Sequence, residues 1–158
     1  MTATKAIPVK RLLSAQAYQL IDREIAKYPA DQKQSAVMGA LTIAQDEVGW
    51  VSPAVIEDVA DYLSMPPIAV YEVATFYNMY NLEEVGTWKI GVCTCLPCAL
   101  REGDKAGENL KQKLGIDFGE TTPDGRFTLI ETECLGSCAD APICLINDKR
   151  VESFMDNA

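Results

Sequence analysis

Histidine is absent from the 158 residues of this chain. Its absence excludes Ser-His and Cys-His nucleophilic sites, zinc fingers with histidine ligands, and Rieske-type clusters, in which two ligands are histidines. The common catalytic zinc sites also use histidine, so they are excluded in the same way. If the chain binds a metal, we therefore expect all of its protein ligands to be sulfur.

Long hydrophobic runs and an excess of positive charge are also missing. No apolar stretch is long enough to span a bilayer, and Met1–Val9 lacks the apolar core of a signal peptide. We therefore expect a cytoplasmic protein with no direct membrane insertion. The net charge of −9 argues against nucleic acid as a partner, because phosphate groups would repel it. No G-x-G-x-x-G motif lies between a strand and a helix, so a dinucleotide site is not expected.

Basic residues are absent from one long segment of the chain. There is no Lys or Arg between Lys33 and Lys89, whereas this segment carries the acidic residues Asp46, Glu47, Glu57, Asp58, Asp61, Glu72, Glu83 and Glu84. The segment is either a solvated acidic face or a docking surface for a basic partner. In the second case the charge would speed association more than it would tighten binding.

The first half of the sequence predicts a small helical bundle. After a basic leader at 1–13, expected to be flexible, the apolar spacing and capping residues predict four short helices within 14–84. Ser14 caps the first, Gly49 ends the second, and Ser52 with Pro53 starts the third. The helices are expected at 14–28, 31–48, 53–63 and 68–80.

The second half, 87–158, predicts a small α/β domain. Its β-rich segments are expected to form strands at 88–93, 126–131, 143–146 and 151–154. A helix that begins at Pro97 and continues to about Leu114 connects the first two strands. The turn signal Thr122-Pro-Asp-Gly125 precedes the second strand. The fold class expected from both halves is α+β, with helices first and a small sheet domain after them.

Four of the six cysteines form two closely spaced pairs. Cys93 and Cys98 enclose four residues, and Cys134 and Cys138 enclose three. Cysteines remain reduced in the cytoplasm, so the pairs indicate metal or redox chemistry more than structural disulfides. Four thiolates brought together form a soft site that selects zinc, copper(I) or an iron–sulfur cluster. Cys144 lies in an apolar segment and is expected to be an inert buried thiol.

The spacing alone leaves three kinds of site open. Structural zinc sites favour C-x2-C spacing, which occurs here only as Cys95-Leu-Pro-Cys98. The same motif follows a strand and opens a helix, as in thiol–disulfide exchange proteins. For an iron–sulfur cluster, we expect the N-terminus of the Pro97 helix to favour negative charge at Cys98. We also expect a positive φ at Gly136, which would let N–H groups converge on sulfur.

The motifs around the cysteines resemble those of the 24-kDa subunit family of respiratory complex I. The resemblance extends from about Ala15 to Met155. Its motifs are Cys93-x4-Cys98, GETTPDGRFTL at 119–129, ECLGSCADAP at 133–142, IND at 146–148, QDEVGW at 45–50 and VATFY at 73–77.

The resemblance implies a helical N-terminal region followed by a thioredoxin-like ferredoxin domain with one 2Fe–2S cluster. Position by position, the family's ligands fall on Cys93, Cys98, Cys134 and Cys138. The resemblance assigns no ligand role to Cys95 or Cys144. A cluster with four thiolates has a net charge of −2 when oxidised and −3 when reduced, so we expect a low potential in this acidic protein.

The resemblance also implies the chain's partners. They are a flavoprotein subunit that binds NADH, FMN and a 4Fe–4S cluster, and a large iron–sulfur subunit. The chain would then be the electron-carrier subunit of an NADH:quinone oxidoreductase, with no complete active site of its own. We expect it in a peripheral arm at the cytoplasmic side of the inner membrane. Related subunits serve NAD-linked formate dehydrogenases and soluble hydrogenases, so this alternative stays open.

Overall fold

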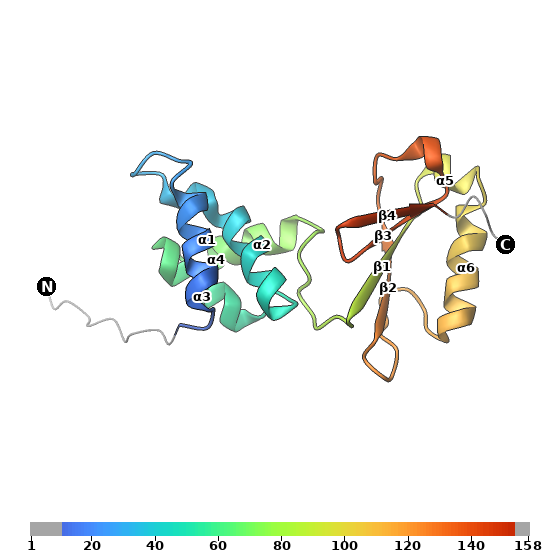
Figure 1. Cartoon of the computed structure of the whole chain (residues 1–158), viewed down its shortest axis with the longest axis horizontal. Coiled ribbons are helices and arrows are strands. Elements are labelled where there is room, and N and C mark those ends of the chain that lie inside the picture. Colours follow the sequence, from blue (N-terminus) through green and yellow to red (C-terminus); the bar gives the residue numbers. More distant parts are fainter. Residues whose placement is uncertain (1–10, 154–158) are drawn as a thin grey trace, which may run out of the picture. The chain divides into compact units, whose positions relative to one another are not determined.

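The computed structural model describes residues 11–153, and the chain divides into two compact units after Glu84 (Figure 1). Each unit has its own hydrophobic core. Most of the predicted leader, residues 1–10, lies outside the described residues. Within the described part of the chain, no helix has both the length and the apolar composition needed to cross a bilayer.

The first unit is helical. Its elements are α1 (Ala15–Ile25), the 3-10 helix η1 (Lys33–Ala36), α2 (Val37–Val48), α3 (Pro53–Leu63) and α4 (Pro67–Phe76). The Ser14 hydroxyl accepts the Ala17 N–H, and the Ser52 hydroxyl accepts the Val55 N–H, so both predicted N-caps are confirmed. Gly49 ends α2 with a φ of 96°, a conformation that glycine adopts without a Cβ penalty.

Three predicted helix boundaries differ from the structure. Helix α1 ends at Ile25 and does not reach Tyr28. The first turn of the helix expected at 31–48 is a 3-10 helix, and α2 begins at Val37. The helix expected to reach Tyr80 ends at Phe76 because the next segment bonds to α2 instead. The Gln45 side chain donates to the Met79 carbonyl at 3.0 Å and accepts the Asn81 N–H at 2.7 Å. The Tyr80 hydroxyl donates to the Met38 carbonyl at 2.9 Å.

The core of the first unit takes apolar residues from all four α-helices. Burial of one large side chain contributes about 1.5–3 kcal/mol relative to exposure. The largest buried side chains of this core are Ile21, Leu41, Val51, Val55, Val59, Leu63 and Val70.

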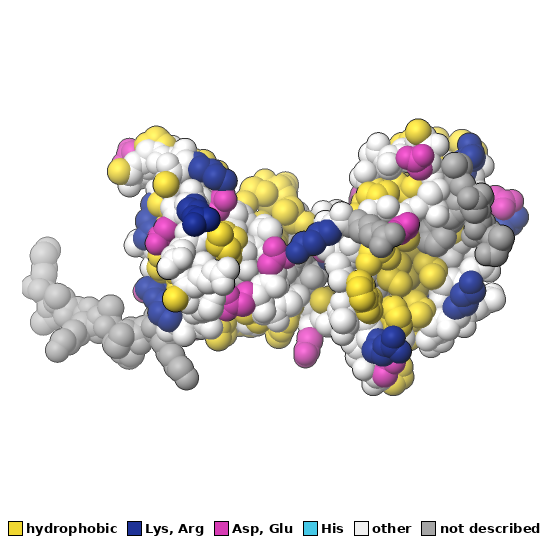
Figure 2. All heavy atoms as spheres, in the orientation of Figure 1, with side chains coloured by type: hydrophobic (Ala, Val, Ile, Leu, Met, Phe, Trp, Pro, Cys, Tyr) yellow, Lys and Arg dark blue, Asp and Glu magenta, His cyan; other side chains and the backbone are white. Residues whose placement is uncertain are grey.

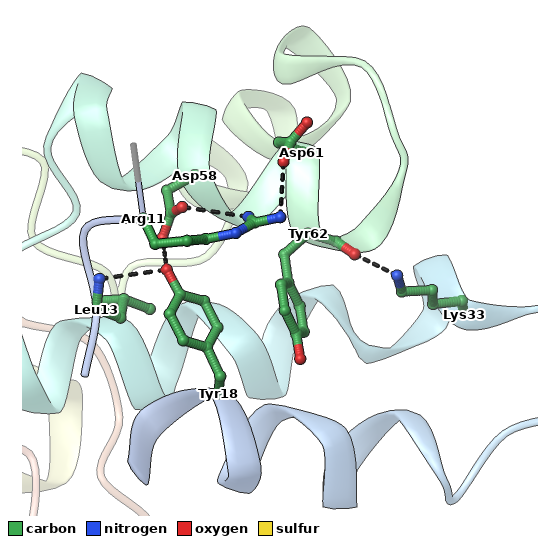
Figure 3. A network of polar contacts seen from close by, with 7 residues as sticks. All are labelled: Arg11, Leu13, Tyr18, Lys33, Asp58, Asp61 and Tyr62. Atoms are coloured by element: carbon green, nitrogen blue, oxygen red, sulfur yellow. Dashed lines mark hydrogen bonds and ion pairs between the residues drawn. The ribbon is translucent and has the colours of Figure 1, made fainter. Parts of the chain in front are cut away.

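One carboxylate, Asp58 of α3, is also buried in this unit (Figure 3). It accepts hydrogen bonds from the Tyr18 hydroxyl and from Arg11 Nη1, the latter at 3.4 Å. The Arg11 guanidinium also lies 2.8 Å from the exposed Asp61 carboxylate and 5.1 Å from the Tyr62 ring centroid. These contacts connect the segment before α1 to α3.

The second unit is a four-stranded sheet with helices in the connection between its first two strands. Its elements are β1 (Trp88–Cys93), α5 (Leu96–Ala99), α6 (Gly103–Leu114), β2 (Phe127–Thr132), the 3-10 helix η2 (Cys138–Asp140), β3 (Ile143–Ile146) and β4 (Arg150–Ser153). The strand order is β2-β1-β3-β4, with β1 and β2 parallel and the other pairs antiparallel. This architecture confirms the α+β class expected from the sequence.

The turns of the second unit follow the local sequence. The Gly125 N–H donates to the Thr122 carbonyl at 2.8 Å, which confirms the turn before β2. Asn147 and Asp148, in the three-residue connection between β3 and β4, have φ values of 50° and 56°. They are the central residues of a turn in which the Lys149 N–H donates to the Ile146 carbonyl at 3.1 Å. The single helix predicted at 97–114 is wrong, because α5 and α6 are separate and Glu102 between them has a φ of 66°.

Candidate metal centre

Three of the candidate thiols belong to the end of β1 and the turn after it. Cys93 is the last residue of β1 and is buried, Cys95 precedes α5, and Cys98 lies within α5 and is also buried. Parallel strands end at the same edge of a sheet, so the loop after β2 returns to this place. Figure 1 shows α5 and the loop that contains η2 at the same end of the second unit.

The second pair, Cys134 and Cys138, lies in the loop after β2, and both residues are exposed. Between them, Gly136 has a φ of 75°, as predicted. Its N–H donates to Cys134 Sγ at 3.4 Å. A residue with a Cβ would be strained in this conformation, so glycine allows the loop to turn a backbone donor toward sulfur.

The backbone N–H of Cys98 is not free at a helix start, in contrast to the prediction for the Pro97 helix. Helix α5 has only four residues, and the Cys98 N–H donates to the Cys95 carbonyl at 2.9 Å, so it is not a free N–H at a helix start. Gly103, the first residue of α6, packs directly against this turn. A Cβ on Gly103 would lie 2.8 Å from the Cys98 carbonyl oxygen, closer than real contacts allow. The absence of a side chain there lets α6 begin beside Cys98.

Backbone N–H groups act on the buried sulfurs. Burial alone would raise the pKa of Cys93, but hydrogen bonds from the Cys95 and Leu135 N–H groups outweigh it and lower that pKa. Burial raises the pKa of Cys98, and a hydrogen bond from the Ile143 N–H opposes this effect. Such donors stabilise negative charge on sulfur. These donors favour the thiolate, the form that binds metal, at Cys93, whereas partial desolvation and the neighbouring Cys134 raise the pKa of Cys138.

The thiols lie close to one another. Cys93 neighbours Cys98, Cys134 neighbours Cys138, and Cys95 neighbours both Cys93 and Cys134. Across the described residues, no three Cys, Asp or Glu side chains are placed to hold a single metal ion. An all-sulfur donor set supplied with N–H donors fits a 2Fe–2S cluster, in which each iron takes two thiolates.

The two remaining cysteines differ in position. Cys95 lies beside the site: its Sγ is 4.0 Å from Glu133 Oε2, and it also neighbours Cys134. Partial desolvation and the negative charges of Cys93, Cys134 and Glu133 raise the pKa of Cys95 to about 11. Cys144 is instead buried in the core of the second unit with Val92 and Leu129. Burial, reinforced by Glu152, raises the pKa of Cys144 to about 11.

Sequence reasoning missed three residues that shape the site. They are Gly103, which gives space to Cys98, and Leu135 and Ile143, whose N–H groups bond to sulfur. Gly103 lies inside the helix predicted at 97–114, and a glycine in a helix interior was the signal that could have been used. No sequence signal identifies the N–H donors of Leu135 and Ile143, because the type of side chain does not determine the direction of the backbone N–H.

Comparison with known proteins agrees with this donor set. A sequence model of the thioredoxin-like 2Fe–2S ferredoxin family matches residues 21–158. The chain belongs to this family. The recognition from the cysteine motifs and the predicted thioredoxin-like fold are thereby confirmed, and a family of 2Fe–2S proteins supports an iron–sulfur cluster over zinc or a redox dithiol.

Among relatives of this ferredoxin family, the chain is similar to an NADH-quinone oxidoreductase subunit of Rickettsia conorii. The two are 48% identical over 136 residues, which cover 85% of this chain and 81% of the relative. It is also similar to the mitochondrial NADH dehydrogenase (ubiquinone) flavoprotein 2 of Dictyostelium discoideum, at 43% identity over 85% of this chain and 55% of the relative.

A solved structure shares the fold of this ferredoxin chain. It is the NAD+-reducing NiFe-hydrogenase in the air-oxidized state, with a TM-score of 0.68 and 21% identity. The match covers 82% of this chain and 22% of the hydrogenase chain. At this identity the likeness concerns the fold alone.

Proposed function

We propose that this chain is the electron-carrier subunit of an NADH:quinone oxidoreductase and holds one 2Fe–2S cluster on Cys93, Cys98, Cys134 and Cys138. The observation that carries the proposal is the convergence of both cysteine pairs at one end of the sheet, where backbone N–H groups bond to sulfur. The 48% identity to an NADH-quinone oxidoreductase subunit supports this enzyme class over a hydrogenase, whose likeness is one of fold.

The chain's own residues would hold charge and exclude water at this centre. When bound, a 2Fe–2S cluster supplies one-electron chemistry. The N–H groups of Cys95, Leu135, Gly136 and Ile143 would stabilise the negative charge that accompanies it. Burial of Cys93 and Cys98 would keep one side of the centre out of water.

The other side of the centre is accessible to a partner. Cys134 and Cys138 are exposed, and beside Cys95 and Cys98 the side chains of Leu96 and Leu100 are 71% and 76% exposed. An exposed rim of apolar side chains suits close contact with another protein, and electron transfer requires such an approach. We infer that electrons enter and leave the chain on this side.

The partners we propose are a flavoprotein subunit that binds NADH, FMN and a 4Fe–4S cluster, and a larger iron–sulfur subunit, in a peripheral arm at the cytoplasmic side of the membrane. Helix α4 supports assembly with other chains. It buries Val70 and Ala74 but leaves Ile68, Tyr71 and Phe76 exposed, the last by 79%. Hydrophobic side chains reach the surface of both units in Figure 2. Aromatic residues are enriched in interface cores.

Reconstitution with the flavoprotein subunit tests the proposed division of labour. The purified chain, mixed with NADH, should keep its oxidised visible spectrum, because a 2Fe–2S cluster accepts one electron and not a hydride. After the flavoprotein subunit is added, NADH should bleach that spectrum. The Cys144→Ser variant serves as a matched control and should behave like the natural chain. Oxidation of NADH by the chain alone would contradict the proposal.

A further inference from the structure

Among the described residues, one buried side-chain oxygen has no hydrogen-bond partner. It is Oγ1 of Thr132, the last residue of β2. Buried polar groups in native proteins are nearly always hydrogen-bonded, because an unpaired group loses the hydration it had in the unfolded chain. The Thr132 hydroxyl therefore needs an acceptor.

Thr128 provides a comparison on the same strand. It lies four residues earlier, so both side chains are on the same face of β2. The Thr128 hydroxyl accepts the Gly86 N–H at 2.6 Å and lies 2.7 Å from the Thr121 hydroxyl. The protein thus supplies partners to the hydroxyl far from the cysteines and none to the hydroxyl near them.

The position of Thr132 places it at the cysteine site. In the parallel pairing of β1 and β2, Thr132 is the register partner of Cys93. Its methyl group leans over β1, since an ideal Cβ on Gly91 would lie 2.5 Å from Thr132 Cγ2. Cys134 follows two residues later in the chain. Thr132 is therefore next to Cys93 across the sheet and two residues before Cys134 along the chain.

We propose that the Thr132 hydroxyl donates a hydrogen bond to a sulfur atom of the bound 2Fe–2S cluster, either the Cys93 thiolate or an inorganic sulfide. The inference rests on the proposed function, which places the cluster on these cysteines. An O–H donor stabilises negative charge on sulfur, and the reduced centre carries one more negative charge than the oxidised one. The hydroxyl therefore raises the reduction potential.

The test is a potentiometric titration, followed by EPR, of the cluster-loaded full chain. The Thr132→Val variant keeps the shape of the side chain but removes the donor. It should lower the equilibrium constant for one-electron reduction by about threefold to tenfold, the effect of one hydrogen bond. A tenfold change corresponds to ~59 mV. Thr132→Ser should stay near the natural value. Thr128→Val should lower thermal stability and leave the potential unchanged.

A second measurement covers the case in which Thr132→Val does not load its cluster. Backbone N–D groups at the site also couple to the reduced centre, so pulsed EPR in D2O compares the natural chain with Thr132→Ser and Thr132→Ala. The first two should share a deuteron coupling that Thr132→Ala lacks, and a Thr132→Ala spectrum identical to that of the natural chain would overturn the proposal. Two further results would overturn the proposal. One is an unchanged reduction potential in Thr132→Val, and the other is the same deuteron coupling in cluster-loaded Thr132→Val as in the natural chain. Either result would mean that the Thr132 hydroxyl bonds to water and not to the cluster. If the natural chain gives no 2Fe–2S signal, the proposed function itself fails.

Discussion

Gly103 determines how closely α6 approaches Cys98. Replacement by alanine would place a Cβ 2.8 Å from the Cys98 carbonyl oxygen and 2.9 Å from its carbonyl carbon. Because backbone atoms cannot yield as a flexible side chain does, Cys98 must move. We predict that Gly103→Ala lowers the iron content of the purified chain and destabilises it by about 1–3 kcal/mol, as overpacking does.

Metal analysis and thermal unfolding check this prediction. Lys105→Ala is the matched control, because it lies in the same helix and its side chain is 72% exposed. The control should keep both the iron content and the stability of the natural chain. Full iron content in Gly103→Ala would show that Cys98 tolerates displacement, contrary to its proposed role.

The six cysteines are expected to divide into two classes on substitution by serine. Ser at Cys93, Cys98, Cys134 or Cys138 should abolish or visibly alter the 2Fe–2S spectrum, because each removes a proposed ligand. Cys95→Ser and Cys144→Ser should keep it. Cys95 gives the sharpest comparison because its thiol lies beside the site. If Cys95→Ser lost the cluster while Cys93→Ser kept it, the ligand assignment would be wrong.

At the scale of elements, Asp58 and Asp61 of α3 offer a matched pair. Both contact Arg11, but the Asp58 side chain is 1% exposed and the Asp61 side chain is 43% exposed. Asp58→Ala leaves Arg11 paired with Asp61 but removes the buried acceptor of the Tyr18 hydroxyl, and an unsatisfied buried donor costs about 1–3 kcal/mol. An exposed pair contributes less than about 1 kcal/mol. Asp58→Ala should therefore destabilise the helical unit more than Asp61→Ala.

Urea unfolding followed by helical circular dichroism measures this difference. Asp58→Ala loses the hydrogen bond from the Tyr18 hydroxyl, which connects α1 to α3. We expect its unfolding midpoint to fall clearly below that of Asp61→Ala. An equal loss of stability in the two variants would contradict this prediction. It would mean that the ion pair with Arg11, and not burial of the carboxylate, determines how much each aspartate stabilises the unit.

The helix boundaries that the sequence predicts correctly are those with local causes. Ser14 and Ser52 cap the helices that follow them, and Gly49 ends α2, because the capping groups lie within a few residues of the groups they satisfy. The end of α4 depends on a distant partner, because the bonds from Gln45 to Met79 and Asn81 hold the segment after Phe76. Local propensity cannot reveal contacts of this kind. The break between α5 and α6 lies at Glu102, whose positive φ its residue type does not predict.

In the candidate site, too, features with local causes could be predicted and features that depend on distant parts of the chain could not. Spacing and donor type pointed to a sulfur site but left Cys95 open as a ligand, and the resemblance then assigned the ligands to the two cysteine pairs. Gly136 could be predicted to turn between Cys134 and Cys138. The N–H donors of Leu135 and Ile143 could not be predicted, because the sheet brings β3 and the loop after β2 to sulfurs of another segment. The unpaired hydroxyl of Thr132 also depends on register and burial.

At the scale of the whole molecule, the chain combines a helical unit with a ferredoxin domain of the thioredoxin-like family. Its relatives carry the names of NADH dehydrogenase subunits, and we propose a carrier role for it within such an assembly. We expect the helical unit to contact other subunits through two features. One is the segment between Lys33 and Lys89, which has acidic residues but no Lys or Arg, and the other is the exposed face of α4.

Whether the four cysteines hold a 2Fe–2S cluster is decided by analysis of iron, acid-labile sulfide and zinc in the purified chain, together with its EPR spectrum after reduction. We predict iron and sulfide in equal amounts, two of each per chain as the family's cluster requires, and an EPR signal that appears only on reduction. A colourless protein that contains zinc and no acid-labile sulfide would contradict this assignment.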